Sequence, residues 1–247
     1  MLKLTRLTRL FSTGLSVPIV DVKSFLTESG NYTQDCKAVA EALHTYGCLI
    51  IKDPRVNAQQ NNHFIDMMEE FFHRRSQDFY AGRPVPDVFP EYDFQVGATP
   101  EYAEKARDHT EVMGGYQGDH RAATPSPPPH DAKWRYFYNI GDVMEDIAQN
   151  QIPKDFPNFK ETVESWGKHM IDGCNTVAEM AAIGMGLDRN VFTEKMKRGP
   201  HKLAPTGSDL VRYKVGTIFA GFHYDFNFLS IHGKSRYPGL FAWLRTG

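Results

Sequence analysis

The chain has 247 residues, of which 41% are hydrophobic, and a formal net charge of -2. This composition excludes wholesale disorder, and the near-neutral charge argues against a nucleic-acid-binding surface and a polybasic membrane patch. No stretch reaches the roughly 20 apolar residues that a membrane-spanning helix needs. The cysteines, Cys36, Cys48 and Cys174, are widely spaced, so we expect neither a disulfide framework nor a thiolate zinc site.

The amino-terminal segment is basic and contains no acidic residue before Asp21. Lysine and arginine alternate with leucine and hydroxyl residues over residues 1–18. This pattern is typical of a mitochondrial presequence, because a secretory signal needs an uninterrupted apolar run. We therefore expect a mitochondrial protein whose mature chain starts between Phe11 and Ile19. The alternative is a disordered basic tail on a cytoplasmic protein.

The first part of the chain alternates strand-like and helical patterns. We expect a strand over residues 17–22, a helix over residues 33–46 that Gly47 ends, and a second strand in the run CLIIKD. A stripe of phenylalanine and methionine predicts a second helix over residues 57–76.

The middle of the chain is richer in proline. Residues 82–100 predict an ordered loop, residues 107–116 a strand, and residues 122–132, which contain SPPPH, a second extended loop. The aromatic run at residues 134–141 predicts another strand.

The longest helical pattern covers residues 156–186, where apolar residues recur every three or four positions. A short helix is expected over residues 191–197. After a turn at residues 205–207 the apolar period becomes two, which predicts strands over three further ranges. These ranges are residues 210–213, 217–232 and 239–244.

A His-x-Asp pair lies inside the predicted strand over residues 217–232. Alternate side chains of a strand share a face, so His223 and Asp225 would be neighbours while Tyr224 points the other way. Such an imidazole and carboxylate can take adjacent positions on an octahedral metal, and Fe(II) suits this mixed donor set. Alone the pair is a weak signal, because the chain has ten histidines and a hydrogen-bonded surface couple is the ordinary interpretation.

The block HYDFNFLSIHGKSRYPGLFAW, which begins at His223, is similar to the metal-binding block of a known family. It resembles the isopenicillin-N-synthase-like branch of the 2-oxoglutarate/Fe(II)-dependent dioxygenases. Leu229 and Ser230 stand where that family has a Leu/Thr-rich strand, and Gly239 and Leu240 where it has a Gly-Leu turn. The order of the earlier elements matches as well, so the resemblance covers most of the chain after the presequence.

The resemblance implies an α+β fold with a double-stranded β-helix, or jelly-roll, core that is incomplete at the carboxyl terminus, with supporting amino-terminal and central helices. It divides the chain into a presequence at residues 1–18, an amino-terminal dioxygenase-like region at 19–120, a loop and long backbone helix at 121–207, and the first jelly-roll strands at 208–247.

By the same resemblance, His223 and Asp225 are the first two Fe(II) ligands. 2-Oxoglutarate is the co-substrate, and its decarboxylation with O2 drives the oxidation of a C–H bond in a small-molecule substrate. The resemblance assigns no catalytic residue beyond the ligands, and it leaves the residues that bind 2-oxoglutarate and the identity of the substrate open.

The family's second histidine and its carboxylate-binding basic residue lie several strands further on, after the position of Gly247. His232 aligns with an apolar position, and Arg245 comes too early to bind the carboxylate. Tyr213 lies where the family often has polar residues that face the cofactor. Three other histidines are third-ligand candidates by position alone, namely His130, His169 and His201. We therefore expect the chain alone to be inactive.

Two other hypotheses compete with a dioxygenase. One is a catalytically dead dioxygenase-like subunit of a mitochondrial assembly, with a protein partner that covers the open edge of the sheet. The other is an unrelated metal-binding or ligand-binding protein for which the resemblance misleads.

Overall fold

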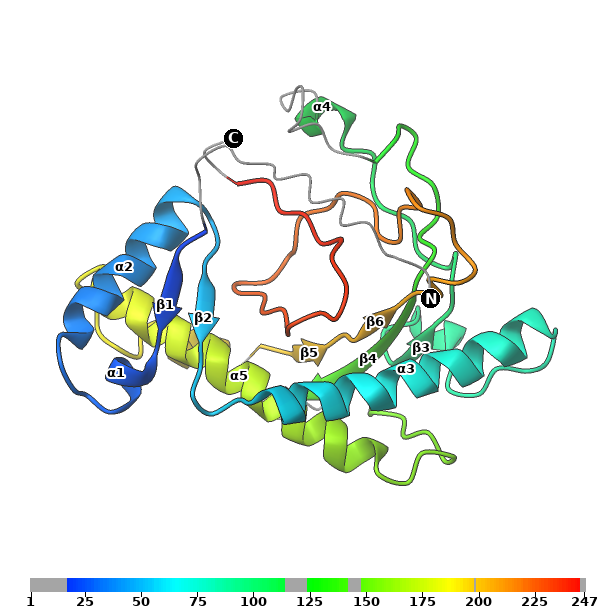
Figure 1. Cartoon of the computed structure of the whole chain (residues 1–247), viewed down its shortest axis with the longest axis horizontal. Helices are drawn as coiled ribbons and strands as arrows, with labels where there is room; N and C mark the ends of the chain where they lie inside the picture. The colour runs from blue at the N-terminus through cyan, green and yellow to red at the C-terminus, as the bar shows by residue number, and fades with distance from the viewer. Residues whose placement is uncertain (1–16, 114–123, 142–147, 198, 245–247) are drawn as a thin grey trace, which may run out of the picture.

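The computed structural model of the chain describes residues 17–113, 124–141, 148–197 and 199–244. The expected presequence therefore lies almost entirely outside the described residues. Within them the fold combines long helices with a two-stranded parallel sheet and a four-stranded antiparallel sheet (Figure 1). The predicted α+β class is confirmed at this level, and the jelly-roll core, expected to be incomplete at the carboxyl terminus, stays a prediction.

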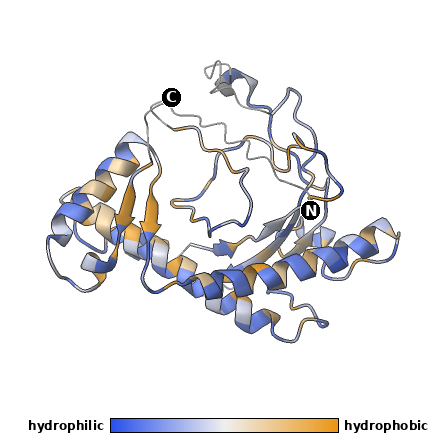
Figure 2. Cartoon of the chain, in the orientation of Figure 1, coloured by the Kyte–Doolittle hydropathy of each residue, from blue (hydrophilic) through white to orange (hydrophobic). Residues whose placement is uncertain are grey.

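The small sheet forms at the start of the described chain. Strand β1 (Ile19–Asp21) pairs in parallel with β2 (Ile50–Lys52), and both lie within the strands predicted from sequence. Figure 2 shows that the two strands are strongly apolar. Ile19 and Ile50 face each other in the register and are 60% and 50% exposed, so one face of this sheet leaves apolar side chains uncovered.

Two helices connect these strands, the short α1 (Lys23–Leu26) and the longer α2 (Tyr32–Thr45). The predicted end of α2 at Gly47 is confirmed. Gly47 has a φ of 79° and donates its N–H to the Leu43 carbonyl at 3.2 Å. This left-handed conformation costs glycine least, since glycine has no Cβ.

Helix α3 (Ala58–Tyr80) is the second predicted helix, extended by one turn. Its start is fixed by a capping box, in which Asn57 accepts from the Gln60 backbone and Gln60 accepts from the Asn57 backbone, both at 2.9 Å. These two bonds satisfy N–H groups that have no partner inside the helix.

The four-stranded sheet is built around β4 (Trp134–Ile140), the aromatic strand predicted from sequence. Strand β4 pairs antiparallel with β3 (Gly97–Thr99), β5 (His201–Leu203) and β6 (Thr206–Gly207). Strand β3 falls in a predicted loop and β6 in a predicted turn, and the sequence made no assignment for β5. Unlike β1 and β2, which are equally short, they do not lie in a longer apolar run that would reveal a strand. The first loop also contains a 3-10 turn, η1 (Pro90–Tyr92).

Helix α5 (Phe159–Gly184) confirms the longest predicted helix, and the short α6 (Thr193–Met196) follows it. One end of α5 packs with α3 and β4, where the Tyr136 ring meets Phe71 and Phe159 at centroid distances of 5.2 and 4.9 Å. Its other end packs with α2 and β1, where Val177 and Met180 are buried. The same helix therefore contributes to both apolar cores.

Four strand predictions, in two regions of the chain, are wrong. Residues 107–116 were expected to be a strand, but within the described part Thr110–Met113 form the short helix α4. Asp108 accepts from the Thr110 backbone N–H at 3.0 Å, which is the local side-chain bond that favours a helical turn over a strand.

The strands expected over residues 210–213, 217–232 and 239–244 are also not present. Residues 208–244, here called the C-terminal segment, form turns and irregular backbone throughout. Period-two alternation favours an extended chain, but a strand also needs a neighbour to pair with. No described strand pairs with this segment, which lies between the two sheets (Figure 1, orange to red).

Candidate metal centre

His223 and Asp225 lie on the C-terminal segment with their side chains next to each other. His223 Nε2 is 3.6 Å from Asp225 Oδ1, and the two side chains are 56% and 45% exposed. Two ligands in adjacent octahedral positions at about 2.1 Å from a metal are roughly 3 Å apart. A small side-chain movement would therefore let both atoms bind one cation. The pair keeps this arrangement although the strand that motivated it is absent.

The backbone beside His223 determines which ring nitrogen is free. His223 Nδ1 lies 2.8 Å from the Gly221 carbonyl oxygen. A carbonyl can only accept, so Nδ1 carries a hydrogen, and of the two neutral tautomers this bond favours the one whose lone pair is on Nε2. Nε2 is also the atom that faces Asp225. This arrangement is the usual one for a metal-binding histidine.

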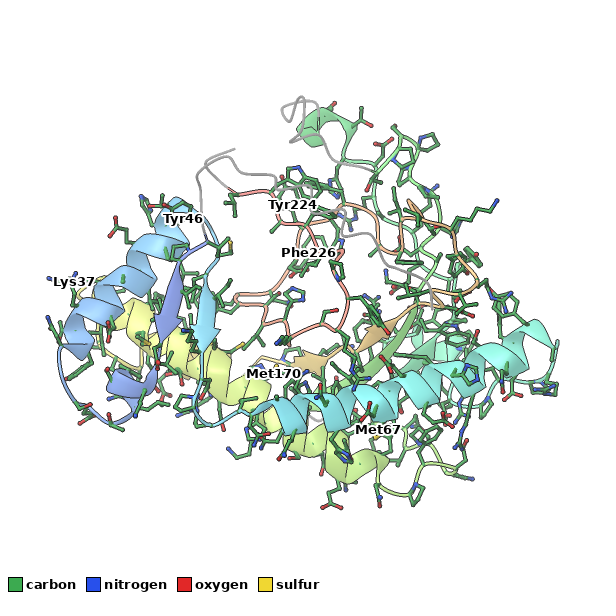
Figure 3. The ribbon with its side chains drawn as sticks, viewed as in Figure 1. Lys37, Tyr46, Met67, Met170, Tyr224 and Phe226 are labelled. Carbon is green, nitrogen blue, oxygen red and sulfur yellow. The ribbon has the colours of Figure 1, made fainter. Side chains whose placement is uncertain are left out.

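Aromatic side chains surround the base of this pair. The Phe222 ring is buried and packs edge-on against the rings of Trp243, Tyr224 and His109, at centroid distances of 5.2, 5.6 and 5.6 Å. Figure 3 labels Tyr224 and Phe226 on this part of the segment. Phe226 is 85% exposed. The packing of Phe222 therefore holds this part of the segment in place, whereas the Phe226 side chain faces solvent.

Sequence reasoning missed the side chains that hold the backbone just before His223. Asp131 Oδ1 accepts the Gly221 N–H at 3.0 Å, and Thr124 Oγ1 accepts the Phe222 N–H at 2.7 Å. Both lie on the loop before β4, about 90 or more positions earlier in the chain. Because no local pattern links residues at such a separation, the sequence carried no signal for them.

Tyr213, which the resemblance places toward the cofactor, is engaged elsewhere. Its hydroxyl donates to the carboxylate of buried Glu101 at 2.5 Å and contacts the hydroxyls of Tyr102 and Tyr80 at 2.7 and 3.2 Å. Burial, together with the bond to Glu101, raises the pKa of Tyr80 to about 12. The cluster ties the start of the C-terminal segment to α3.

The three histidines considered as third-ligand candidates do not join the pair in the part of the chain that the structure describes. His201 lies in β5, His169 on α5 contacts Gln60, and His130 bridges to Lys105. His232 is exposed on the C-terminal segment. Across the described ranges, no group of three or more histidine, cysteine, aspartate or glutamate side chains is placed to hold a metal ion. A third protein ligand is therefore not identified.

A separate groove of about 300 Å³ lies between α3 and α5. None of its lining residues belongs to the C-terminal segment. They come from these helices and the turn before α5, and are Gln60, His63, Phe64, Asn158, Glu161, Thr162, Ser165, Trp166 and His169. Two pairs of polar side chains in it bond to each other: His63 with Thr162 at 3.3 Å, and Gln60 with His169 at 2.9 Å.

Comparison with known proteins gives a fold match without a sequence match. No family model matches the chain, and neither does any curated protein. Among solved structures, the chain is similar to a full-length Neurospora crassa protein in complex with alpha-KG, with 21% identity and a TM-score of 0.52. This match covers 73% of the chain and 50% of the Neurospora protein.

Two further structures agree. The C-terminally truncated apo form of the same Neurospora protein is 19% identical with a TM-score of 0.54, over 78% of this chain and 62% of that one. A protein described as a putative 2OG-Fe(II) oxygenase family member from Caulobacter crescentus is 19% identical with a TM-score of 0.53. This match covers 80% of the chain and 59% of the Caulobacter protein. At these identities the likeness establishes a shared fold, and the chain spans about half to three-fifths of its structural neighbours.

None of the helices in the described residues is both long and apolar enough to cross a bilayer.

Proposed function

We propose that this chain is part of a non-haem Fe(II)/2-oxoglutarate-dependent dioxygenase in which His223 and Asp225 bind the iron. The observation that carries the proposal is the side-by-side placement of His223 Nε2 and Asp225 Oδ1 at 3.6 Å. It is supported by the fold shared with 2OG-Fe(II) oxygenases. The finer assignment, to the isopenicillin-N-synthase-like branch with a jelly-roll core, rests on the sequence resemblance.

The donor set fits Fe(II). His223 offers a neutral nitrogen whose lone pair is free because Nδ1 is bonded to Gly221, and Asp225 offers a carboxylate. Mixed imidazole and carboxylate ligation suits Fe(II), which also leaves positions open for small ligands. Bound iron, with 2-oxoglutarate and O2, would supply the oxidation of a substrate C–H bond. The chain's own residues hold the metal and orient it, and no described residue is assigned to 2-oxoglutarate.

The metal-binding claim is tested by titrating the chain with Co(II) and following its visible spectrum. Loss of His223 or Asp225 removes one of two protein ligands, so His223→Ala and Asp225→Ala should each weaken binding by more than about tenfold. His232→Ala is the matched control, because His232 is an exposed histidine on the same segment, and it should leave binding unchanged. Equal affinity in all four proteins would refute the site.

Turnover is a separate question. Because the described residues offer only two protein ligands, we propose that this polypeptide alone does not convert 2-oxoglutarate. The assay is succinate formation with Fe(II) and O2. Succinate formation that disappears in His223→Ala would overturn this expectation and would show that a complete site exists.

A catalytically inactive binding subunit is the second candidate. Two observations favour it: no three-ligand group is found in the described part, and the C-terminal segment exposes large apolar side chains that a protein partner could cover. This candidate predicts that a partner, rather than a metal, protects the segment from hydrogen exchange.

For localisation we propose the mitochondrion, on the acid-free basic pattern of residues 1–18 alone. Fusing these residues to a fluorescent protein tests the proposal. Mitochondrial import that is lost when the three basic residues Lys3, Arg6 and Arg9 become glutamate would support it. A diffuse cytoplasmic signal from the unmodified fusion would refute it.

A further inference from the structure

One buried carboxylate contacts the backbone directly beside the candidate metal pair. Asp131 is 6% exposed and accepts the Gly221 N–H through Oδ1 at 3.0 Å. Its other oxygen, Oδ2, accepts from Lys133 Nζ, a side chain that is equally buried. One carboxylate oxygen of Asp131 therefore pairs with the charged Lys133, and the other binds the backbone of the C-terminal segment.

Asp131 is itself held firmly at both ends of its backbone. Its N–H donates to the Glu104 carbonyl, and its carbonyl accepts from the Tyr102 N–H, both at 2.9 Å. Glu104 also approaches Lys133 Nζ at 3.2 Å, so the carboxylate sits in a network that does not depend on the C-terminal segment. A buried group with this many fixed partners can serve as a rigid reference point.

Gly221 links this reference point to the metal pair. Its N–H is bonded to Asp131, and its carbonyl accepts from His223 Nδ1 at 2.8 Å. A Cβ added at Gly221 would lie 2.7 Å from the Ala106 Cβ, so only glycine allows this close approach. The chain of contacts from Lys133 through Asp131 and Gly221 ends at the ring of His223.

We propose that Asp131 is a positioning residue for His223: by holding Gly221, it aims the Gly221 carbonyl at Nδ1, which favours the tautomer with the hydrogen on Nδ1 and directs Nε2 toward Asp225. This inference rests on the proposed function only in taking Nε2 as a metal ligand. Asp131 does not touch the metal, and its effect reaches the site through one glycine.

The direct readout is the tautomer of His223 in the metal-free protein. A neutral imidazole released from its carbonyl partner populates both tautomers, and long-range proton–nitrogen NMR of the ring distinguishes them at about pH 8. The His223 signal is assigned by its loss in His223→Gln. In the wild-type chain we expect the single tautomer with hydrogen on Nδ1.

Asp131→Ala removes the acceptor for the Gly221 N–H, while Lys133 keeps Glu104 as a partner. We expect both tautomers of His223 in this variant and a Co(II) affinity about tenfold weaker, the usual effect of losing an outer partner of a ligand. Asp131→Asn is the second variant, because it keeps the volume of the side chain. Its amide nitrogen replaces one of the two accepting oxygens, and charged Lys133 is the stronger of the two donors. The Gly221 N–H should therefore lose its acceptor, and the tautomer should shift in the same direction.

The control is Asp53→Asn. Asp53 forms a partly buried pair with a base two positions later, Arg55, and bonds to that residue rather than to Gly221. It should lower stability and leave the His223 tautomer and Co(II) affinity as in the wild type. If the substitutions acted only through lower stability, all three variants would change the His223 tautomer and the Co(II) affinity to a similar extent.

The outcomes separate the two proposals. If Asp131→Ala and Asp131→Asn both retain a single tautomer and bind Co(II) within about twofold of wild type, Asp131 is not a positioning residue. A mixture of tautomers in the wild-type chain would overturn the inference equally. If the tautomer shifts as expected but Co(II) never binds at His223, the positioning of the ring is real and the proposed function fails.

Discussion

Gly221 is the residue at which packing and the candidate metal centre meet. An added Cβ would come within 2.7 Å of the Ala106 Cβ and 3.4 Å of Thr124 Cγ2. Gly221→Ala must therefore push the segment away from the loop that holds it, and we expect a loss of about 1–3 kcal/mol in unfolding free energy, measured by urea denaturation.

The pair Gly221→Ala and Ala106→Gly provides the control for this prediction. Removing the Ala106 methyl restores the space that the new Cβ needs. The double variant should recover most of the lost stability, beyond what two additive losses would give. If it is less stable than Gly221→Ala alone, close packing at this point is not the cause.

Asp53 makes stability depend on pH. Burial would raise its pKa, but hydrogen bonds from Arg55 outweigh burial, and the pKa of Asp53 lies below its usual value. A lowered folded pKa means that the contribution is full above the unfolded pKa of about 3.9 and is lost as the pH falls through the folded value. Asp53→Asn should cost on the order of 2 kcal/mol at neutral pH. In urea denaturation, the difference in unfolding free energy between the wild type and Asp53→Asn should shrink as the pH falls below about 4. A difference that does not depend on pH would contradict the assignment.

At the scale of elements, the start of α3 depends on the bonds between Asn57 and Gln60. Asn57→Ala removes the acceptor for the Gln60 N–H and should lower the unfolding free energy by about 1 kcal/mol. Asn57→Ser, which keeps an acceptor, should restore most of it. Urea denaturation of the three proteins checks the order, and equal stability of the alanine and serine variants would rule out capping.

The elements that sequence predicted well are those that local spacing determines. Helices α2, α3 and α5 and the aromatic strand β4 each carry a long repeat, and α3 also carries its capping residues. Strands β3, β5 and β6 are too short to show a period and do not lie in a longer apolar run. The expected strands after residue 207 failed for a different reason, because alternation is local whereas pairing needs a partner elsewhere in the molecule. The His223–Asp225 pair was predictable because its two members are two residues apart, and Asp131 was not.

At the scale of the whole molecule, the C-terminal segment exposes large apolar side chains. Val215 and Leu240 are 106% and 74% exposed, and Phe226 and Phe241 exceed 65%. Such a surface favours self-association. Changing Val215 and Leu240 together to serine should reduce light scattering of concentrated protein while unfolding free energy stays within about 0.5 kcal/mol. Unchanged scattering would mean that these side chains do not drive association.

Helix α5 belongs to both apolar cores, one shared with α3 and β4 and the other with α2 and β1. Neither core can be dismantled without exposing part of the same helix. We therefore expect the two cores to unfold together, so that the loss of methyl groups at Val177 in one core also destabilises the other.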